Sequence, residues 1–207
     1  MNKIFCMIGK SSSGKDSIYK AVLERLPLEP LVIYTTRPMR EHETDGKEYH
    51  FTDNAGFEHM RSEGKVIESR TYHTVHGEWT YFTSGDSIDL SLHNYAVIGT
   101  LESFIPIRDH YGAESVIPVY IEVEDGERLA RALARERQEE KPKYAELCRR
   151  FLADSEDFSE EKLESAGITR RFSNNGSFTE CVGEVTEYIK NADSNEKTTI
   201  QEETING

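Results

Sequence analysis

The chain has few cysteines, no long hydrophobic run and a deficit of positive charge. Its three cysteines, Cys6, Cys148 and Cys181, are odd in number and widely spaced, which fits neither a disulfide framework nor a zinc site. No run approaches the roughly 18 apolar residues that a membrane-spanning helix needs. The N-terminus lacks a charged start followed by a long apolar stretch, so no secretory signal is expected. We therefore expect a cytoplasmic protein without a membrane partner.

Acidic residues outnumber basic ones in this chain. The sequence has 38 Asp and Glu against 25 Lys and Arg, which gives a formal net charge of −13. Nucleic acids and anionic membranes both require a basic face, so neither is an expected partner. Any anionic ligand must then be held by local clusters of Lys and Arg.

Short apolar runs alternate with helical patterns along the sequence. The 207 residues suit one domain of ordinary size, or one with insertions. Continuous apolar runs of this length are typical of strands buried in a parallel sheet. The alternation therefore predicts an α/β fold with a parallel sheet core. The expected strands lie at residues 4–8, 31–34, 95–99, 116–121 and 167–172.

Residues 35–83 interrupt this alternation. Turn signals occur at Asp45–Gly46 and His76–Gly77, and aromatic and β-branched clusters flank them. The pattern predicts an insertion rich in antiparallel strands, with a short helix at about 54–63. The core is then formed by residues 1–34 and 84–191.

A second segment, at about 125–165, is charged and helical, and we call it the lid. Leu129 and Leu133 form a thin apolar seam, and arginines fall on a neighbouring face. The tail at 192–207 has two isoleucines and otherwise lacks core residues, so it is expected to be disordered.

The segment "GKSSSGKDS" after the first expected strand is nearly a phosphate-binding loop. The usual pattern is Gly, four free residues, Gly, Lys, then Ser or Thr. Backbone N–H groups of such a loop cradle phosphate oxygens at the start of a helix. A simple glycine-containing turn is the alternative, but the position between a strand and a helix favours nucleotide binding. The expected ATP-binding residues are Gly9, Ser11, Ser12, Ser13, Gly14, Lys15, Asp16 and Ser17.

Asp16 stands where the usual pattern has a hydroxyl. A carboxylate is a good oxygen ligand for Mg²⁺, either directly or through a metal-bound water. Alternatively, Asp16 merely stabilises the first turn of the following helix, where its charge meets the positive end of the helix dipole. We expect Asp16 to contribute to a magnesium site.

A second motif, "TTRPMREHETDGKEYHF", lies at residues 35–51. Arg37 and Arg40 are three residues apart and precede Tyr49. The arginine fork suits phosphate, and a tyrosine hydroxyl adds a donor. A charged hairpin face without a ligand is the alternative.

Together, these two motifs resemble the nucleotide-binding signature of guanylate kinases. The pattern "TTRxxRxxExxGxxY" follows an expected strand, downstream of the phosphate loop, and the resemblance covers roughly residues 2–190. It implies transfer of the terminal phosphoryl of ATP to GMP, with Mg²⁺ as cofactor. It also implies a P-loop parallel sheet core, a β-rich GMP-binding insertion and a helical lid.

The resemblance also implies roles for individual residues. Glu68 matches the carboxylate that accepts hydrogen bonds from guanine N1 and N2, and Thr83 matches the residue that contacts O6. From the residues alone, Glu68 would be an exposed strand carboxylate. The residues that correspond to the holders of the GMP phosphate are Arg37, Arg40, Tyr49 and Tyr81.

On the ATP side, Lys15 and two arginines of the lid, Arg135 and Arg150, correspond to the catalytic cations. Asn174 corresponds to a residue beside the adenine. Solvated helix arginines are the alternative for Arg135 and Arg150.

The sequence departs from the family at several places. Lys10 and Ser12 replace a Pro and a Gly of the family loop, and Thr100 stands where the family has an Asp. Either Glu102 or ordered water takes the role of that Asp.

Two other functions remain open. A kinase of the same fold could phosphorylate ribose 1,5-bisphosphate, although Glu68 and Thr83 would then lack a guanine partner. A non-catalytic protein-binding module is the other, although Lys15 and both loop glycines favour catalysis. Either a monomer or a homodimer is compatible with the sequence.

Overall fold

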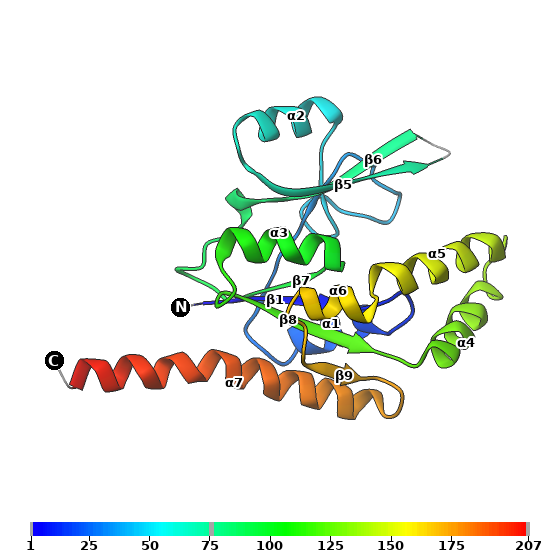
Figure 1. Cartoon of the computed structure of the whole chain (residues 1–207). Helices are drawn as coiled ribbons and strands as arrows, with labels where there is room; N and C mark the ends of the chain where they lie inside the picture. The colour runs from blue at the N-terminus through cyan, green and yellow to red at the C-terminus, as the bar shows by residue number, and fades with distance from the viewer. Residues whose placement is uncertain (1, 75–76, 206–207) are drawn as a thin grey trace.

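The computed structural model describes residues 2–74 and 77–205 (Figure 1). Its core is a sheet of five parallel strands in the order β2-β7-β1-β8-β9. All five residues of β1 are buried, as expected for a central strand covered on both faces. The predicted α/β fold with a parallel sheet core is therefore confirmed. The strands are β1 (Ile4–Ile8), β2 (Glu29–Pro30), β7 (Tyr95–Ile98), β8 (Val116–Glu122) and β9 (Arg171–Ser173).

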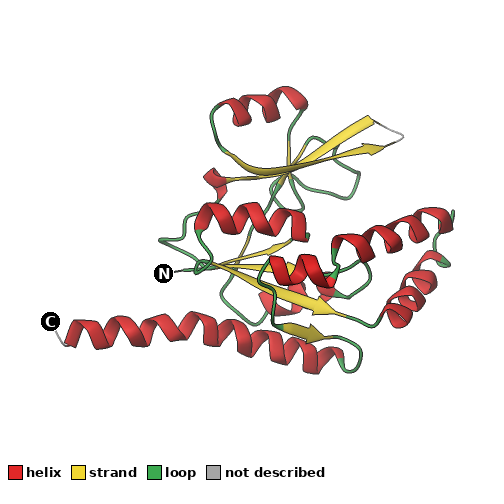
Figure 2. Cartoon of the chain, in the orientation of Figure 1, coloured by secondary structure: helices red, strands yellow, loops and turns green. Residues whose placement is uncertain are grey.

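Helices cover both faces of this sheet and make three layers (Figure 2). They are α1 (Lys15–Leu23), α3 (Leu101–Tyr111), α6 (Glu160–Ser165) and α7 (Phe178–Ile205). Successive residues of β1 point to opposite faces. Ile4, Cys6 and Ile8 pack with apolar residues of α3 and α6, while Phe5 and Met7 pack with those of α1 and α7. The core is thus divided between the two faces of the sheet.

The insertion forms a second sheet, in the order β4-β3-β6-β5. Its β3 is parallel to β4, and the pairs β3–β6 and β5–β6 are antiparallel. The predicted turn at His76–Gly77 lies partly outside the described residues. The predicted helix at 54–63 is α2, whose N-cap Asp53 accepts a hydrogen bond from the Gly56 amide. The elements are β3 (Tyr34–Thr35), β4 (His50–Phe51), α2 (Asn54–Ser62), β5 (Val66–Thr74), β6 (Gly77–Ser84) and the 3₁₀ helix η1 (Gly85–Ser87).

The apolar run at 31–34, predicted as one strand, instead crosses between the two sheets. The Leu31 amide donates to the Ala96 carbonyl in the core sheet, at 2.8 Å. Tyr34 and Thr35 then pair with β6 of the insertion. Leu31 is buried in the core and Ile33 packs against it, so the run is apolar without being one strand. An apolar pattern alone does not distinguish the two cases.

The last predicted strand also begins later than expected. Gly167 has φ of 73° and follows helix α6, and Ile168 packs into the core without joining the sheet. The strand proper is β9, which starts at Arg171.

The lid segment comprises α4 (Asp125–Glu136), α5 (Tyr144–Asp157) and α6. Helices α4 and α5 lie beyond the carboxyl end of β8, whereas α6 packs against the core sheet (Figure 1). The predicted seam of Leu129 and Leu133 is wrong, because Leu129 is 39% exposed. Arg128 is the buried residue of α4, with its guanidinium 4.0 Å from the centre of the Phe151 ring. A guanidinium can be buried here because it stacks on an aromatic face and pairs with carboxylates.

Helix α7 continues to Ile205, and the disorder expected at 192–207 stays a prediction. The sequence contains no proline or glycine between Gly183 and Gly207, so nothing in that stretch breaks the helix. Residues 206–207 lie outside the described residues. Within the described chain, no helix combines the length and the apolar character that crossing a membrane requires.

Candidate active site

The phosphate-binding loop connects β1 to α1 and depends on its two glycines. A Cβ at Gly9 would lie 2.5 Å from the Ile121 carbonyl oxygen, so the loop lies directly against β8. Gly14 has φ of 86°, and a Cβ there would lie 2.5 Å from the Asn174 side-chain nitrogen. Both positions therefore require glycine.

Asn174 lies beneath this loop. Its side-chain amide donates to the Ser13 carbonyl at 2.8 Å, and the residue is buried. This contact fixes the backbone of the loop, and the predicted contact with adenine stays a prediction. Ser13 Oγ is also buried and has no hydrogen-bond partner among the residues that the structure describes. A buried hydroxyl without a partner is costly, and a bound phosphate would supply the missing acceptor.

Lys15 and Asp16 begin helix α1. The Lys15 ammonium lies 3.7 Å from an Asp16 carboxylate oxygen, and the Asp16 side chain is 69% exposed. Gly14, at the N-cap, provides no side-chain cap. The first-turn amides of α1 therefore remain available to an anion, which the helix dipole also favours.

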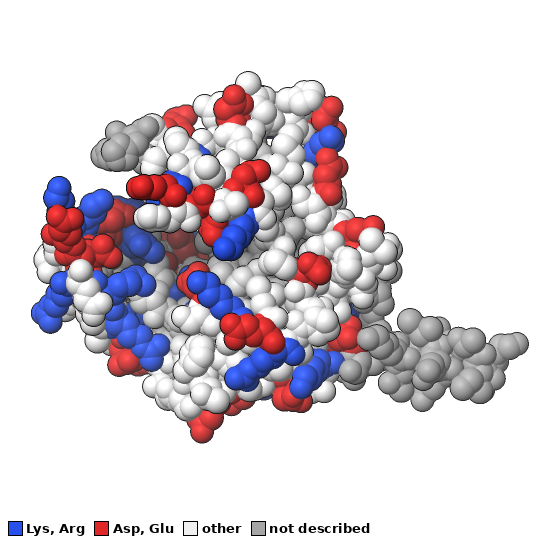
Figure 3. All heavy atoms as spheres, turned by 180° about the vertical axis from the view of Figure 1, so that it is seen from behind, with Lys and Arg blue, Asp and Glu red and all other residues white. Residues whose placement is uncertain are grey.

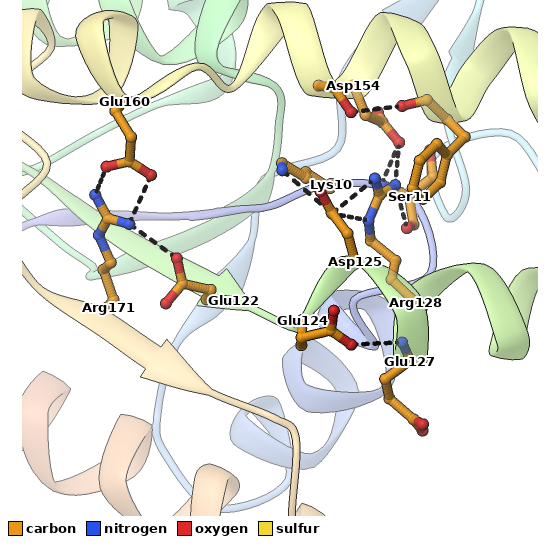
Figure 4. Close-up of polar contacts among 12 residues, drawn as sticks. Lys10, Ser11, Glu122, Glu124, Asp125, Glu127, Arg128, Asp154, Glu160 and Arg171 are labelled. Atoms are coloured by element: carbon orange, nitrogen blue, oxygen red, sulfur yellow. Dashed lines mark hydrogen bonds and ion pairs between the residues drawn. The ribbon is translucent and has the colours of Figure 1, made fainter.

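The lid contacts the loop through a network of charges centred on the buried Arg128 (Figure 4). Arg128 donates to Asp154 at 3.0 Å and to Asp125 at 3.1 Å. The same Asp154 oxygen accepts the Ser11 amide at 2.9 Å, and Lys10 pairs with Asp125 at 3.3 Å. Both ends of the lid arm formed by α4 and α5 are thereby tied to the loop.

A cavity of about 590 Å³ lies between the loop, the lid and the insertion. Arg135 donates to Ser12 Oγ and Arg150 to Ser11 Oγ, each at 3.1 Å. Arg40 reaches the cavity from the insertion. Lys and Arg side chains gather around this hollow on the lid side of the molecule (Figure 3). The charged lining comprises Arg40, Arg128, Arg135, Lys141, Lys143, Arg150, Glu136, Glu139 and Glu146.

Arg37, unlike Arg40, is buried and already paired. Its two terminal nitrogens donate to the Glu43 carboxylate at 2.9 and 2.6 Å. Its Nε donates to the Tyr81 hydroxyl at 3.2 Å, and its guanidinium lies 5.4 Å from the centre of the Tyr49 ring. Hydrogen bonds from Arg37 lower the pKa of Glu43. The structure thus brings together three of the predicted phosphate holders. It pairs them with Glu43, the fixed glutamate of the motif, to which the sequence analysis assigned no role.

Glu68 and Thr83 face each other across β5 and β6. The Thr83 hydroxyl donates to one Glu68 oxygen at 2.7 Å. Arg70 Nε donates to the other oxygen at 3.1 Å, and the Glu68 side chain is only 3% exposed. Burial raises the pKa of Glu68, while the charge of Arg70 acts in the opposite direction. Sequence reasoning missed Arg70, although residues two apart on a strand share one face.

Thr100 is the N-cap of α3 and forms a capping box with Ser103. Its hydroxyl also accepts a hydrogen bond from Arg70 Nη1 at 3.3 Å. Glu102 is exposed on the first turn of α3, and its charge contributes to raising the pKa of Glu68. The two alternatives for the role of the family Asp, Glu102 and ordered water, both stay predictions.

The described cysteines and carboxylates form no preassembled metal centre. Cys6 and Cys181 are buried, Cys148 is exposed, and all three are free thiols. Burial raises the pKa of Cys6 to about 12, so it stays a thiol at neutral pH. Across residues 2–74 and 77–205, no three His, Cys, Asp or Glu side chains are grouped as metal ligands. The magnesium role expected for Asp16 stays a prediction.

Comparisons with known proteins find similarity to guanylate kinases. The family model described as Guanylate kinase matches residues 1–97. Over 87 residues the chain is 39% identical to the guanylate kinase of Bordetella pertussis, covering 42% of this chain and 39% of the relative. Over 121 residues it is 33% identical to that of Thermotoga maritima, covering 58% and 48%. The chain thus spans less than half the length of these curated relatives.

The whole fold is similar to that of a solved guanylate kinase. The crystal structure of guanylate kinase from Anaplasma phagocytophilum superposes with a TM-score of 0.60, at 18% identity, covering 91% of this chain and 85% of that one. Most of this chain therefore has a fold similar to that of this guanylate kinase. The resemblance to guanylate kinases is confirmed, by sequence over the first 97 residues and by fold over most of the chain.

Proposed function

We propose that this protein is a guanylate kinase, which transfers the γ-phosphoryl of ATP to GMP and depends on Mg²⁺. The observation that carries the proposal is the cavity where the loop, Arg40 and the lid arginines meet. Phosphoryl transfer needs little covalent chemistry from the protein. It needs two nucleotides in line, with positive charge around the transferred group.

Each side of the cavity has a separate task in this mechanism. The loop amides and Lys15 hold the phosphates of ATP at the start of α1. Arg40 holds the phosphate of the acceptor, and Arg135 and Arg150 neutralise charge on the group in transit. In the present arrangement these two arginines contact hydroxyls of the loop that would hold the ATP phosphates. The lid also excludes water from the γ-phosphoryl.

Asp16, together with phosphate oxygens, would hold Mg²⁺, which would offset the negative charge of the phosphates. We expect Asp16→Ala to raise several-fold the Mg²⁺ concentration needed for half-maximal rate, and to lower that rate. Glu24→Ala is the matched control, because Glu24 is an exposed carboxylate at the other end of α1. The measurement is a magnesium titration of ADP release. An unchanged titration for Asp16→Ala would contradict the metal role, and slightly earlier melting alone would leave Asp16 as a helix-stabilising residue.

The acceptor is tested by ADP release with ATP, Mg²⁺ and a panel of GMP, dGMP, AMP, UMP and ribose 1,5-bisphosphate. We expect faster turnover of GMP than of AMP or UMP, because Glu68 and Thr83 are suited to the donors and the O6 of guanine. Faster turnover of AMP would contradict the assignment of the base. No ADP release with any member would favour a non-catalytic binding module instead.

One observation favours ribose 1,5-bisphosphate as a second candidate acceptor. The sequence argument against it was that Glu68 would lack a partner without guanine. In the structure, Arg70 and Thr83 already satisfy the Glu68 carboxylate. An acceptor without a base is therefore compatible with this site, and the same panel separates the two candidates.

The cytoplasmic location and the monomeric or homodimeric state stay predictions. They concern the surroundings of the protein and do not alter the chemistry proposed for the cavity.

A further inference from the structure

Arg70 donates hydrogen bonds to the Glu68 carboxylate, the group that would accept hydrogen bonds from guanine. Its Nε donates to one Glu68 oxygen at 3.1 Å, and its Nη2 lies 3.5 Å from the other. The Thr83 hydroxyl donates a hydrogen bond to that second oxygen, at 2.7 Å. Guanine N1–H and N2–H would need both oxygens of the same carboxylate. The guanidinium and the base are therefore competitors for one acceptor group.

The position of Arg70 is well fixed, so this competition has a cost. The Arg70 side chain is 9% exposed, and its Nη1 reaches Thr100 on α3, across from the insertion. Arg70 thus links the sheet of the insertion to the core. If guanine displaced it from Glu68, a largely buried guanidinium would lose its carboxylate partner, which is strongly unfavourable.

We propose that Arg70 is a specificity-determining residue of the acceptor site, which competes with guanine for Glu68 and weakens the binding of GMP. This inference rests on the proposed function, since it concerns the same acceptor site. Removing the guanidinium leaves Glu68 buried with Thr83 and open to the two guanine donors.

The test measures binding by calorimetric titration with GMP and with IMP, which lacks the 2-amino group. We expect Arg70→Met to bind GMP about tenfold or more tightly than the wild type. The two guanine donors can then form charge-assisted hydrogen bonds with Glu68. The gain for IMP should be smaller, since IMP offers one donor instead of two. The titration is run at mildly alkaline pH. This keeps Glu68 ionised, because burial raises its pKa and the opposing charge of Arg70 is gone in the variant. Arg70→Gln serves as a second variant if Arg70→Met melts early.

Two controls tie the effect to this pair of residues. Arg61→Met removes an exposed arginine of α2, which pairs with Glu58, and should leave GMP binding unchanged. The double variant Arg70→Met/Glu68→Gln should lose the gain, because the acceptor that guanine uses is then altered. Unchanged or weaker GMP binding in Arg70→Met, an equal gain for IMP, or a gain that persists in the double variant would each overturn the inference.

The outcome is separable from the proposed function. If Arg70→Met binds GMP more tightly, but neither it nor the wild type releases ADP with GMP, the competition stands and the GMP kinase activity falls. If GMP is turned over but binds the wild type and Arg70→Met equally tightly, the GMP kinase activity stands and the competition is refuted.

Discussion

Arg150→Ala is expected to lower kcat by about 10²–10³-fold, with a much smaller change in KM for ATP. The guanidinium of Arg150 lies 3.1 Å from Ser11 Oγ, at the edge of the loop that would hold the phosphates. A donor aimed at charge that develops during the reaction acts mainly on the chemical step, and removing one such donor has an effect of about this size. The measurement is steady-state ADP release with saturating acceptor.

Arg149→Ala is the matched control on the same helix. Arg149 is 66% exposed and pairs with Glu146, so it has the same charge without the contact to the loop. Its replacement should leave kcat nearly unchanged. If the two variants lost activity equally, the effect would come from the net charge of the lid, and the assignment of Arg150 would be wrong.

Arg37→Ala is expected to destabilise the protein as well as to weaken GMP use. The Arg37 side chain is 3% exposed and pairs at 2.6 Å with Glu43. Removing one partner of a buried pair leaves the other charge uncompensated, at a cost of about 3–5 kcal/mol. Thermal unfolding should detect this as a lower midpoint, with the free energy of unfolding reduced by a comparable amount.

Arg40→Ala separates binding from stability. Arg40 is exposed and lines the cavity, so its loss should leave the melting midpoint nearly unchanged. It should raise KM for GMP by roughly 10- to 100-fold, the value of a charge-assisted hydrogen bond. Titration with a non-hydrolysable ATP analogue should give unchanged affinity. Equal losses of GMP and ATP binding would contradict a role in holding the acceptor.

Local sequence patterns determined much of this fold. The apolar run at 4–8, followed by Gly9 and Gly14, predicted a buried strand and a phosphate loop, because close packing and a left-handed φ restrict those two positions to glycine. Strand–helix alternation predicted the parallel sheet, which is covered by helices on both faces. These features depend on neighbouring residues, so they can be read from the order of the chain.

Tertiary structure decided how the charged residues pair. Arg128 belongs to a polar helix face by its spacing, yet it is buried because Asp154 and Phe151 approach it from another helix. The run at 31–34 crosses between two sheets, and only their packing determines where each short strand ends.

The pairing of Glu68 with Arg70 was likewise decided by the tertiary structure. Residues two apart on a strand lie on one face, but the sequence could not show that these two pair. That pairing arises because α3 and β6 enclose them, and exclusion of water makes each charge depend on the other.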